Sequence, residues 1–142
     1  MSVAKPSWNV GDELERRTLP PVTRLQLIKY AGASGDFNPI HTIDEAAEEA
    51  GLGGVIAHGM LTAATMGLPF SPYLEHGYVK GLEVRFSGMV YLGDEIAVGG
   101  RLSGREASGE GCLYTFEVYA ENGENTVASG TVDFLVFESS CS

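Results

Sequence analysis

The chain has 142 residues, of which 44% are hydrophobic and 20% charged, so it is long enough for one domain with a sizeable core over residues 1–142. Nineteen acidic side chains against nine basic ones give a formal net charge of −10, which disfavours nucleic acid as a partner because its backbone is also negative. The N-terminus lacks the apolar run of a signal peptide, and no apolar run reaches the roughly eighteen residues of a membrane span. We therefore expect a cytoplasmic protein.

The first segments predict an extended lead-in and then a helix. The lead-in covers residues 8–19 and is followed by the Pro20-Pro21 pair, which breaks regular structure. Thr23 has capping-box spacing with the glutamine three residues later, so we expect it to begin a helix that ends at Gly32 and Gly35.

Two further helices are predicted before residue 70. Thr42, with Glu45 three residues on, predicts the start of a short helix that stops at Gly51. The stretch 59–68 is apolar on nearly every side, which is typical of a buried helix.

From Val79 onward the apolar residues recur at every second position, as in half-buried strands. We expect strands near residues 79–87, 95–102, 114–119 and 126–137, joined as an antiparallel meander. Helices followed by strands predict an α+β domain in which the sheet covers the apolar helix. Its edge strand needs protection, so we expect it to pair with a second copy of the chain.

The loop after the first predicted helix concentrates residues that can carry chemistry. Gly35 permits a sharp bend, Asn38 can cap a helical turn and Pro39 suits the first position of that turn, so Asp36 and His41 lie on a constrained loop. An imidazole can accept a proton from water near neutral pH, and a neighbouring carboxylate can share that water. The alternative is that the aspartate only caps the turn and the histidine is a satisfied polar residue.

A second block, residues 56–62 (IAHGMLT), opens the predicted buried helix. The amide of Gly59 is not shielded by a side chain and can bind a carbonyl oxygen that gains negative charge. We interpret His58 as a turn residue that positions this backbone, rather than as a second base or a metal ligand. His76 is expected in a solvent-facing loop.

Cysteine spacing predicts neither a metal site nor a disulfide framework. Cys112 and Cys141 are the two cysteines of the chain, and we interpret both as incidental thiols. Because HExxH and CxxC patterns are also missing from the sequence, we expect neither a metal nor another cofactor.

Residues 30–41 (YAGASGDFNPIH) resemble the signature of MaoC-like (R)-specific enoyl-CoA hydratases, and residues 56–62 also look like that family's sequence. Residues 56–62 together with Val84-Arg85-Phe86 look especially like the B-type catalytic subunit of the mycobacterial (3R)-hydroxyacyl-ACP dehydratase. The resemblance implies a hot-dog fold and reversible hydration of trans-2-enoyl thioesters to (R)-3-hydroxyacyl thioesters. It also implies that Asp36 and His41 activate water, that the Gly59 amide binds the thioester carbonyl, and that Asn38 and His58 belong to the substrate-binding region. We expect the asparagine to act mainly as a structural cap.

The resemblance implies an acyl-CoA or acyl-ACP substrate and a homodimer or higher oligomer, or a heterodimer with a related hot-dog subunit. Some hydratases carry a serine near the acyl pocket where this chain has Gly67, and we hypothesise that this glycine, with Ala63 and Ala64, leaves space for an acyl chain.

One alternative function is that of a hot-dog thioesterase, but that class generally places a catalytic group on the central helix, and residues 59–68 contain no carboxylate. The other is a partner subunit that shapes the tunnel of a catalytic neighbour.

Overall fold

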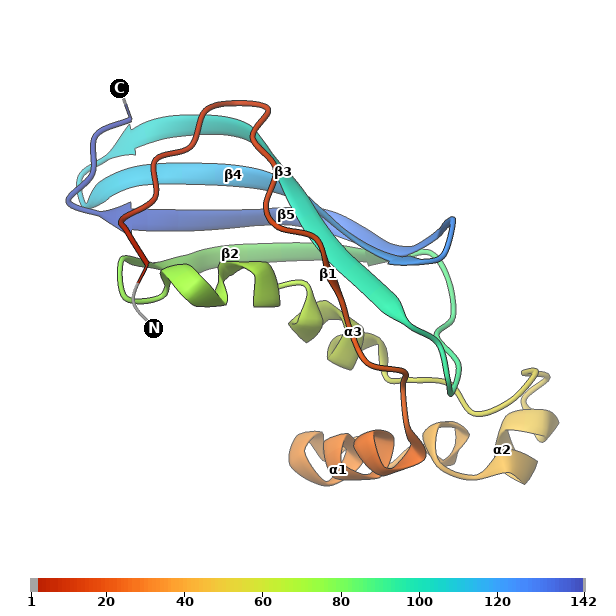
Figure 1. Cartoon of the computed structure of the whole chain (residues 1–142). Helices are drawn as coiled ribbons and strands as arrows, with labels where there is room; N and C mark the ends of the chain where they lie inside the picture. The colour runs from red at the N-terminus through yellow and green to blue at the C-terminus, as the bar shows by residue number, and fades with distance from the viewer. Residues whose placement is uncertain (1–2, 142) are drawn as a thin grey trace.

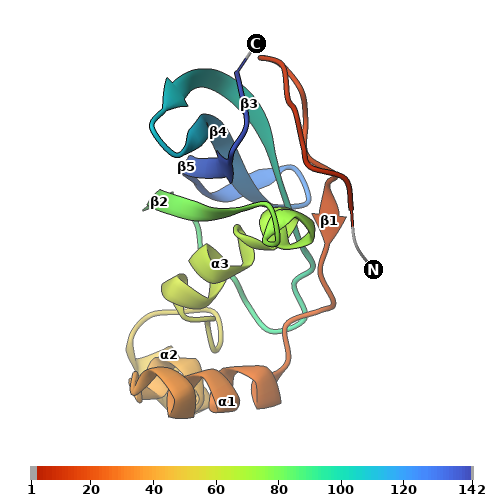
Figure 2. The ribbon, with the colours of Figure 1, turned by 90° about the vertical axis from the view of Figure 1, so that its left-hand side faces the viewer.

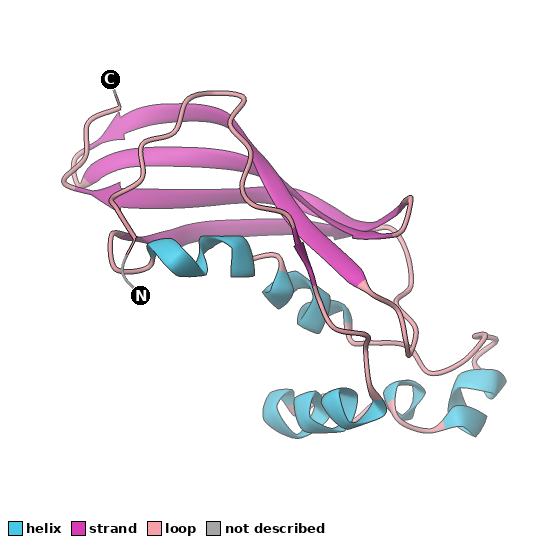
Figure 3. Ribbon diagram, in the orientation of Figure 1, coloured by secondary structure: helices cyan, strands magenta, loops and turns pink. Residues whose placement is uncertain are grey.

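An antiparallel sheet of five strands curves over a central helical segment in the computed structural model, which describes residues 3–141 (Figures 1 and 3). The strands follow the spatial order β1-β3-β4-β5-β2, with bounds β1 Arg17–Thr18, β2 Gly77–Phe86, β3 Ile96–Ser108, β4 Gly111–Asn122 and β5 Asn125–Phe137. The helices are α1 Arg24–Ser34, α2 Asp44–Glu49 and α3 Gly59–Thr65, with 3-10 helices at Pro39–His41 and Leu68–Tyr73. This arrangement confirms the predicted α+β hot-dog fold.

The position of β2 differs from the predicted meander. Strands β3, β4 and β5 follow one another as hairpins, but β2 pairs with β5 and so lies at the opposite edge from β1. Its alternating residues predicted one buried face, yet Leu82 and Phe86 are 41% and 47% exposed. The apolar face of β2 is therefore only partly covered by its own chain, since Val84 packs against the core but Leu82 and Phe86 do not.

Helix α1 begins and ends as its sequence predicts. The Thr23 hydroxyl accepts a hydrogen bond from the amide of Gln26 at 3.1 Å, and Gly35 takes the left-handed conformation with φ 76° at the other end. The predicted start of α2 is wrong, because its N-cap is Ile43 rather than Thr42. The preceding 3-10 turn ends at Thr42, whose amide bonds back to the carbonyl of Pro39.

Helix α3 is shorter than the predicted stretch and not buried on every side. Its residue Met60 is 63% exposed, whereas Thr62 and Ala63 are buried. After Gly67 the chain continues as a 3-10 helix that contains Pro69 and Pro72. Proline removes an amide donor and restricts the residue before it, so the α-helical bonding does not continue.

Aromatic rings fill the space between the second 3-10 helix and the sheet. Phe70 is fully buried and stacks on Phe134 with 5.3 Å between ring centroids. Trp8, from the lead-in, packs edge-on against Tyr114 and Phe116 at 5.0 and 5.1 Å. This packing anchors the segment after α3.

Helices α1 and α2 lie together on the side of α3 away from the sheet (Figure 2).

The prediction of two free thiols is wrong, because Cys112 and Cys141 form a disulfide with their Cα atoms 5.3 Å apart. Cys112 is buried in β4, and Cys141 lies in the tail after β5. Strand β5 runs back beside β4 and brings the tail to the start of β4, a proximity that a separation of 29 residues does not reveal.

No helix among the described residues is long and apolar enough to cross a membrane.

Candidate active site

The loop between α1 and the first 3-10 helix is held by side chains that bond to its own backbone. A carboxylate oxygen of Asp36 accepts a hydrogen bond from the amide of Asn38 at 3.2 Å. The side-chain oxygen of Asn38 in turn accepts one from the amide of Ile40, also at 3.2 Å, and so caps the 3-10 helix. These bonds hold the backbone that follows Asp36 in one conformation.

The imidazole of His41 is oriented by the backbone of the strand-like segment before α3. Its Nδ1 lies 2.8 Å from the carbonyl oxygen of Ile56. Because a carbonyl can only accept, Nδ1 carries the proton and donates, which leaves a lone pair on Nε2 in the neutral ring. The ring is only 8% exposed, so this orientation is fixed by burial as well as by the hydrogen bond.

The structure brings the two candidate catalytic groups together. Nε2 of His41 lies 3.8 Å from Oδ2 of Asp36. That distance is too long for a direct hydrogen bond, but one water about 2.8 Å from each atom can bond to both. The Asp36 side chain is about half exposed, so water can reach it.

His58 has a role that its sequence position did not predict. Its Nε2 donates a hydrogen bond to the backbone carbonyl of Asp36 at 3.2 Å. Its ring stacks on that of His41 with centroids 3.8 Å apart and meets the edge of Tyr30 at 4.8 Å. It makes no side-chain cap to α3, although it is the N-cap residue. His58 therefore contacts both candidate catalytic residues.

A cavity of about 150 Å³ opens beside His41. Its walls come from the first 3-10 helix, the segment before α3, the first turn of α3, the end of β2 with the following loop, and β5. The lining residues are His41, Ile56, Ala57, Gly59, Thr62, Phe86, Gly88, Met89, Val90 and Val127. A Cβ atom at Gly59 would lie 3.3 Å from the ring of Phe86, so glycine keeps this wall open. His41 and the first residue of α3 thus border the same cavity.

Asp36, His41 and His58 offer ligand atoms within 4.8 Å of one another. The geometry is nevertheless poor for a single ion. The rings are stacked with only 24° between their planes, so their in-plane lone pairs do not converge on one point. In addition, Nδ1 of His41 and Nε2 of His58 are occupied by backbone carbonyls. The expectation that no metal takes part stays a prediction.

Comparison with known proteins places the chain in a family. A family model described as "MaoC like domain" matches residues 6–122. The chain belongs to the MaoC-like domain family. A 54-residue segment is 46% identical to 3-hydroxyacyl-thioester dehydratase X of Mycobacterium tuberculosis, which covers 34% of this chain and 19% of that protein. The curated relatives that it matches are longer, and the matched segments span between 4% and 40% of their lengths.

Solved structures share the hot-dog fold of this MaoC-like domain. The (R)-hydratase from A. caviae involved in PHA biosynthesis has a TM-score of 0.81 and 21% identity, over 92% of this chain and 98% of that one. The ChsH1-ChsH2 complex from Mycobacterium tuberculosis has a TM-score of 0.78 and 18% identity, over 90% and 98%. At these identities the likeness shows the fold alone.

Sequence reasoning missed the walls that β2 and its following loop supply to the MaoC-like site. Phe86 and Met89 line the small cavity although they lie more than 40 residues after His41. Phe86 belongs to the Val84-Arg85-Phe86 block of the resemblance, but neither that block nor the apolar side chain at each position assigned these residues to the site. The contact between Phe86 and the start of α3 exists only in the folded chain, so the spacing of the residues did not predict it.

Proposed function

We propose that this MaoC-like domain hydrates trans-2-enoyl thioesters to (R)-3-hydroxyacyl thioesters, or catalyses the reverse dehydration. The observation that carries the proposal is the 3.8 Å approach of Asp36 to His41, which lines a cavity together with Gly59. The family and the dehydratase relative support the same reaction class. We also propose that the chain corresponds to a B-type dehydratase subunit.

The geometry assigns a part to each group. A water held between Asp36 and His41 adds its oxygen to C3 of the enoyl thioester while Nε2 of the imidazole takes one of its protons. The carboxylate accepts the other hydrogen bond of that water and orients it. The Gly59 amide donates to the thioester oxygen and stabilises the enolate-like charge until the imidazolium gives the proton that it took to C2, which returns the ring to its neutral form. Dehydration follows the same steps backward.

The experiment measures hydration of crotonyl-CoA without added metal or nucleotide. The loss of the enoyl absorbance reports the rate. Asp36→Asn and His41→Ala should each lower kcat by about 10²- to 10⁴-fold, because each removes a group that handles the water's protons. Asp44→Asn and His76→Ala are matched controls that remove the same functional groups elsewhere and should retain turnover. Circular dichroism checks that each variant is folded. Full turnover in both site variants contradicts the proposal, and release of free CoA by the wild type would identify a thioesterase instead.

We also propose that β2 pairs with β2 of a second copy. The strand lies at the sheet edge and exposes four large hydrophobic side chains, which isolated domains seldom leave uncovered: Tyr78, Val79, Leu82 and Phe86. Because Phe86 also lines the small cavity, a partner over β2 would shield that cavity from solvent. Sedimentation equilibrium should give twice the mass of one chain. A monomer that gains activity only when a related hot-dog subunit is added would replace the homodimer with a heterodimer.

A further inference from the structure

The hydrogen bond that orients His41 is the first of three that follow one another in a line. Nδ1–H of His41 donates to the carbonyl of Ile56, and the peptide unit of that carbonyl ends in the N–H of Ala57. This N–H donates to the carbonyl of Val90 at 2.8 Å, whose own peptide unit ends in the N–H of Tyr91. Two peptide groups therefore connect the imidazole to the loop after β2.

The line ends on a carboxylate. The amide of Tyr91 donates to Oδ2 of Asp94 at 2.8 Å. All three bonds are 2.8 Å long and donate in the direction of Asp94, so the two peptide dipoles are aligned and polarise each other. Because a peptide is planar, neither group can turn without breaking a bond on each side. We call this line, from His41 through the 56–57 and 90–91 peptides to Asp94, the peptide relay.

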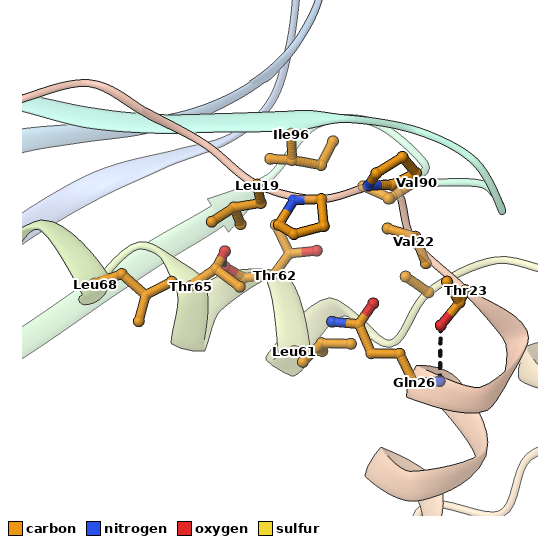
Figure 4. A pocket seen from close by; sticks show the side chains of 13 residues that line it. Leu19, Val22, Thr23, Gln26, Leu61, Thr62, Thr65, Leu68, Val90 and Ile96 are labelled. Atoms are coloured by element: carbon orange, nitrogen blue, oxygen red, sulfur yellow. Dashed lines mark hydrogen bonds between the residues drawn. The ribbon is translucent and has the colours of Figure 1, made fainter.

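Backbone bonds hold the turn that carries the carboxylate in place. Gly93 has φ 86°, which allows the tight turn in which the amide of Asp94 bonds back to the carbonyl of Tyr91 at 3.1 Å. Val22, in the segment between β1 and α1, donates to the carbonyl of Asp94 at 3.0 Å and accepts from the amide of Gly93 at 2.8 Å. The side chains of Val22 and Val90 both line the cavity of about 390 Å³ shown in Figure 4. The end of the relay is thus fixed to the same framework as its middle.

We propose that Asp94 is a positioning residue for the reaction, which supports the charged imidazole of His41 through the peptide relay. The inference rests on the proposed function, in which Nε2 takes a proton from water. The positive charge that then forms on the ring strengthens the donation from Nδ1, and the aligned peptides carry this polarisation toward a negative charge. Because the imidazolium forms only during the reaction, the support should act on kcat rather than on KM.

A second turn, residues 9–12, is built in the same way but leads elsewhere. Oδ2 of Asp12 accepts a hydrogen bond from the amide of the first turn residue at 2.8 Å, as Oδ2 of Asp94 does in its own turn. The carbonyl that precedes this amide belongs to Trp8 and accepts a hydrogen bond from the guanidinium of Arg105. The two aspartates therefore hold matching turns, and Asp94 is the one whose line of bonds reaches the candidate base.

The decisive variant is Asp94→Asn, because the side-chain oxygen of asparagine can still accept the bonds from Tyr91 and from the amide of Asn122, while the negative charge is lost. With crotonyl-CoA, kcat should fall about three- to tenfold and KM should stay within about twofold, since two peptide groups separate the charges. Asp12→Asn removes the same charge from the matching turn and should change neither constant.

A further control tests whether the stability of the turn, rather than its charge, is what matters. Asn122→Ala removes one hydrogen bond to the carboxylate but leaves both the charge and the relay, so kcat should be retained. An unchanged kcat in Asp94→Asn would overturn the inference. A loss in Asp12→Asn or in Asn122→Ala as large as that in Asp94→Asn would also overturn it.

Nuclear magnetic resonance of the His41 ring nitrogens tests the relay without any turnover. In the neutral ring of the wild type the proton should lie on Nδ1, and a proton on Nε2 would overturn the inference without the need for a variant. Asp94→Asn should lower the pH at which the ring gains its second proton by about half a unit to one unit, because a negative charge that favours the imidazolium is lost. Asp12→Asn should leave that pH unchanged. The titratable side chains that the described structure places against this ring, Asp36 and His58, are the same in both variants.

The two measurements separate this inference from the proposed function. If the ring's protonation responds to Asp94→Asn as expected but the wild type hydrates no enoyl thioester, the relay stands and the proposed function fails. If the wild type hydrates crotonyl-CoA but neither kcat nor the ring's protonation responds to Asp94→Asn, the relay is wrong and the proposed function stands.

Discussion

Removing the disulfide between Cys112 and Cys141 is expected to lower the stability of the fold without touching the candidate site. The bond closes a loop of 29 residues that contains most of β4 and all of β5. By loop-closure entropy, such a link disfavours the unfolded chain by about 3 to 4 kcal/mol. That is a large share of the roughly 5 to 15 kcal/mol by which domains are usually stable.

Cys141→Ser tests this, because the residue lies in the tail and its loss leaves Cys112 as a small apolar side chain in the core. Urea unfolding can be followed by the fluorescence of Trp8, the single tryptophan, which packs against the buried aromatic rings. The variant should unfold at lower urea than the oxidised wild type, and a reductant should lower only the wild type to the same midpoint. Coincident midpoints without reductant, or two free thiols titrated in the native protein, would refute the reasoning. In a reducing compartment the bond would open and its contribution would be lost.

Two further predictions concern the candidate site. Gly59→Ala places a methyl group 3.3 Å from the Phe86 ring, so it should disturb the start of α3. We expect kcat on crotonyl-CoA to fall by about ten- to a hundredfold. Gly53→Ala is the control, because a Cβ there has nothing within 4 Å, and it should leave kcat unchanged. His58→Phe keeps a ring against His41 but loses the hydrogen bond to the Asp36 carbonyl, so kcat should fall about tenfold with little change in KM. Steady-state kinetics measures both, and an unchanged kcat in His58→Phe would assign that histidine to packing alone.

The parts of this protein that could be predicted from sequence are those whose physical cause is local. Thr23 and Gly35 bound α1 through interactions within a few residues. The bonds from Asp36 to Asn38 and from Asn38 to Ile40 are equally local, so the loop that holds the candidate carboxylate could be predicted without knowledge of the fold.

The features that could not be predicted depend on contacts between distant segments. His58 meets the Asp36 carbonyl across 22 residues, and Cys141 meets Cys112 across 29. Leu19 and Ile96 likewise reach the face of α3 that carries Leu61 and Thr65 only in the folded chain.

The alternation in β2 shows how a correct periodicity can predict burial and still not identify what covers the strand. Leu82 and Phe86 recur with the period of a half-buried strand, yet the chain leaves both exposed. A period-2 pattern reflects an apolar surface around the strand, and that surface need not belong to the same molecule. The mismatch between the apolar pattern and the burial of β2 therefore favours a second subunit at this edge. Because Phe86 also borders the cavity beside His41, assembly and catalysis would depend on the same strand.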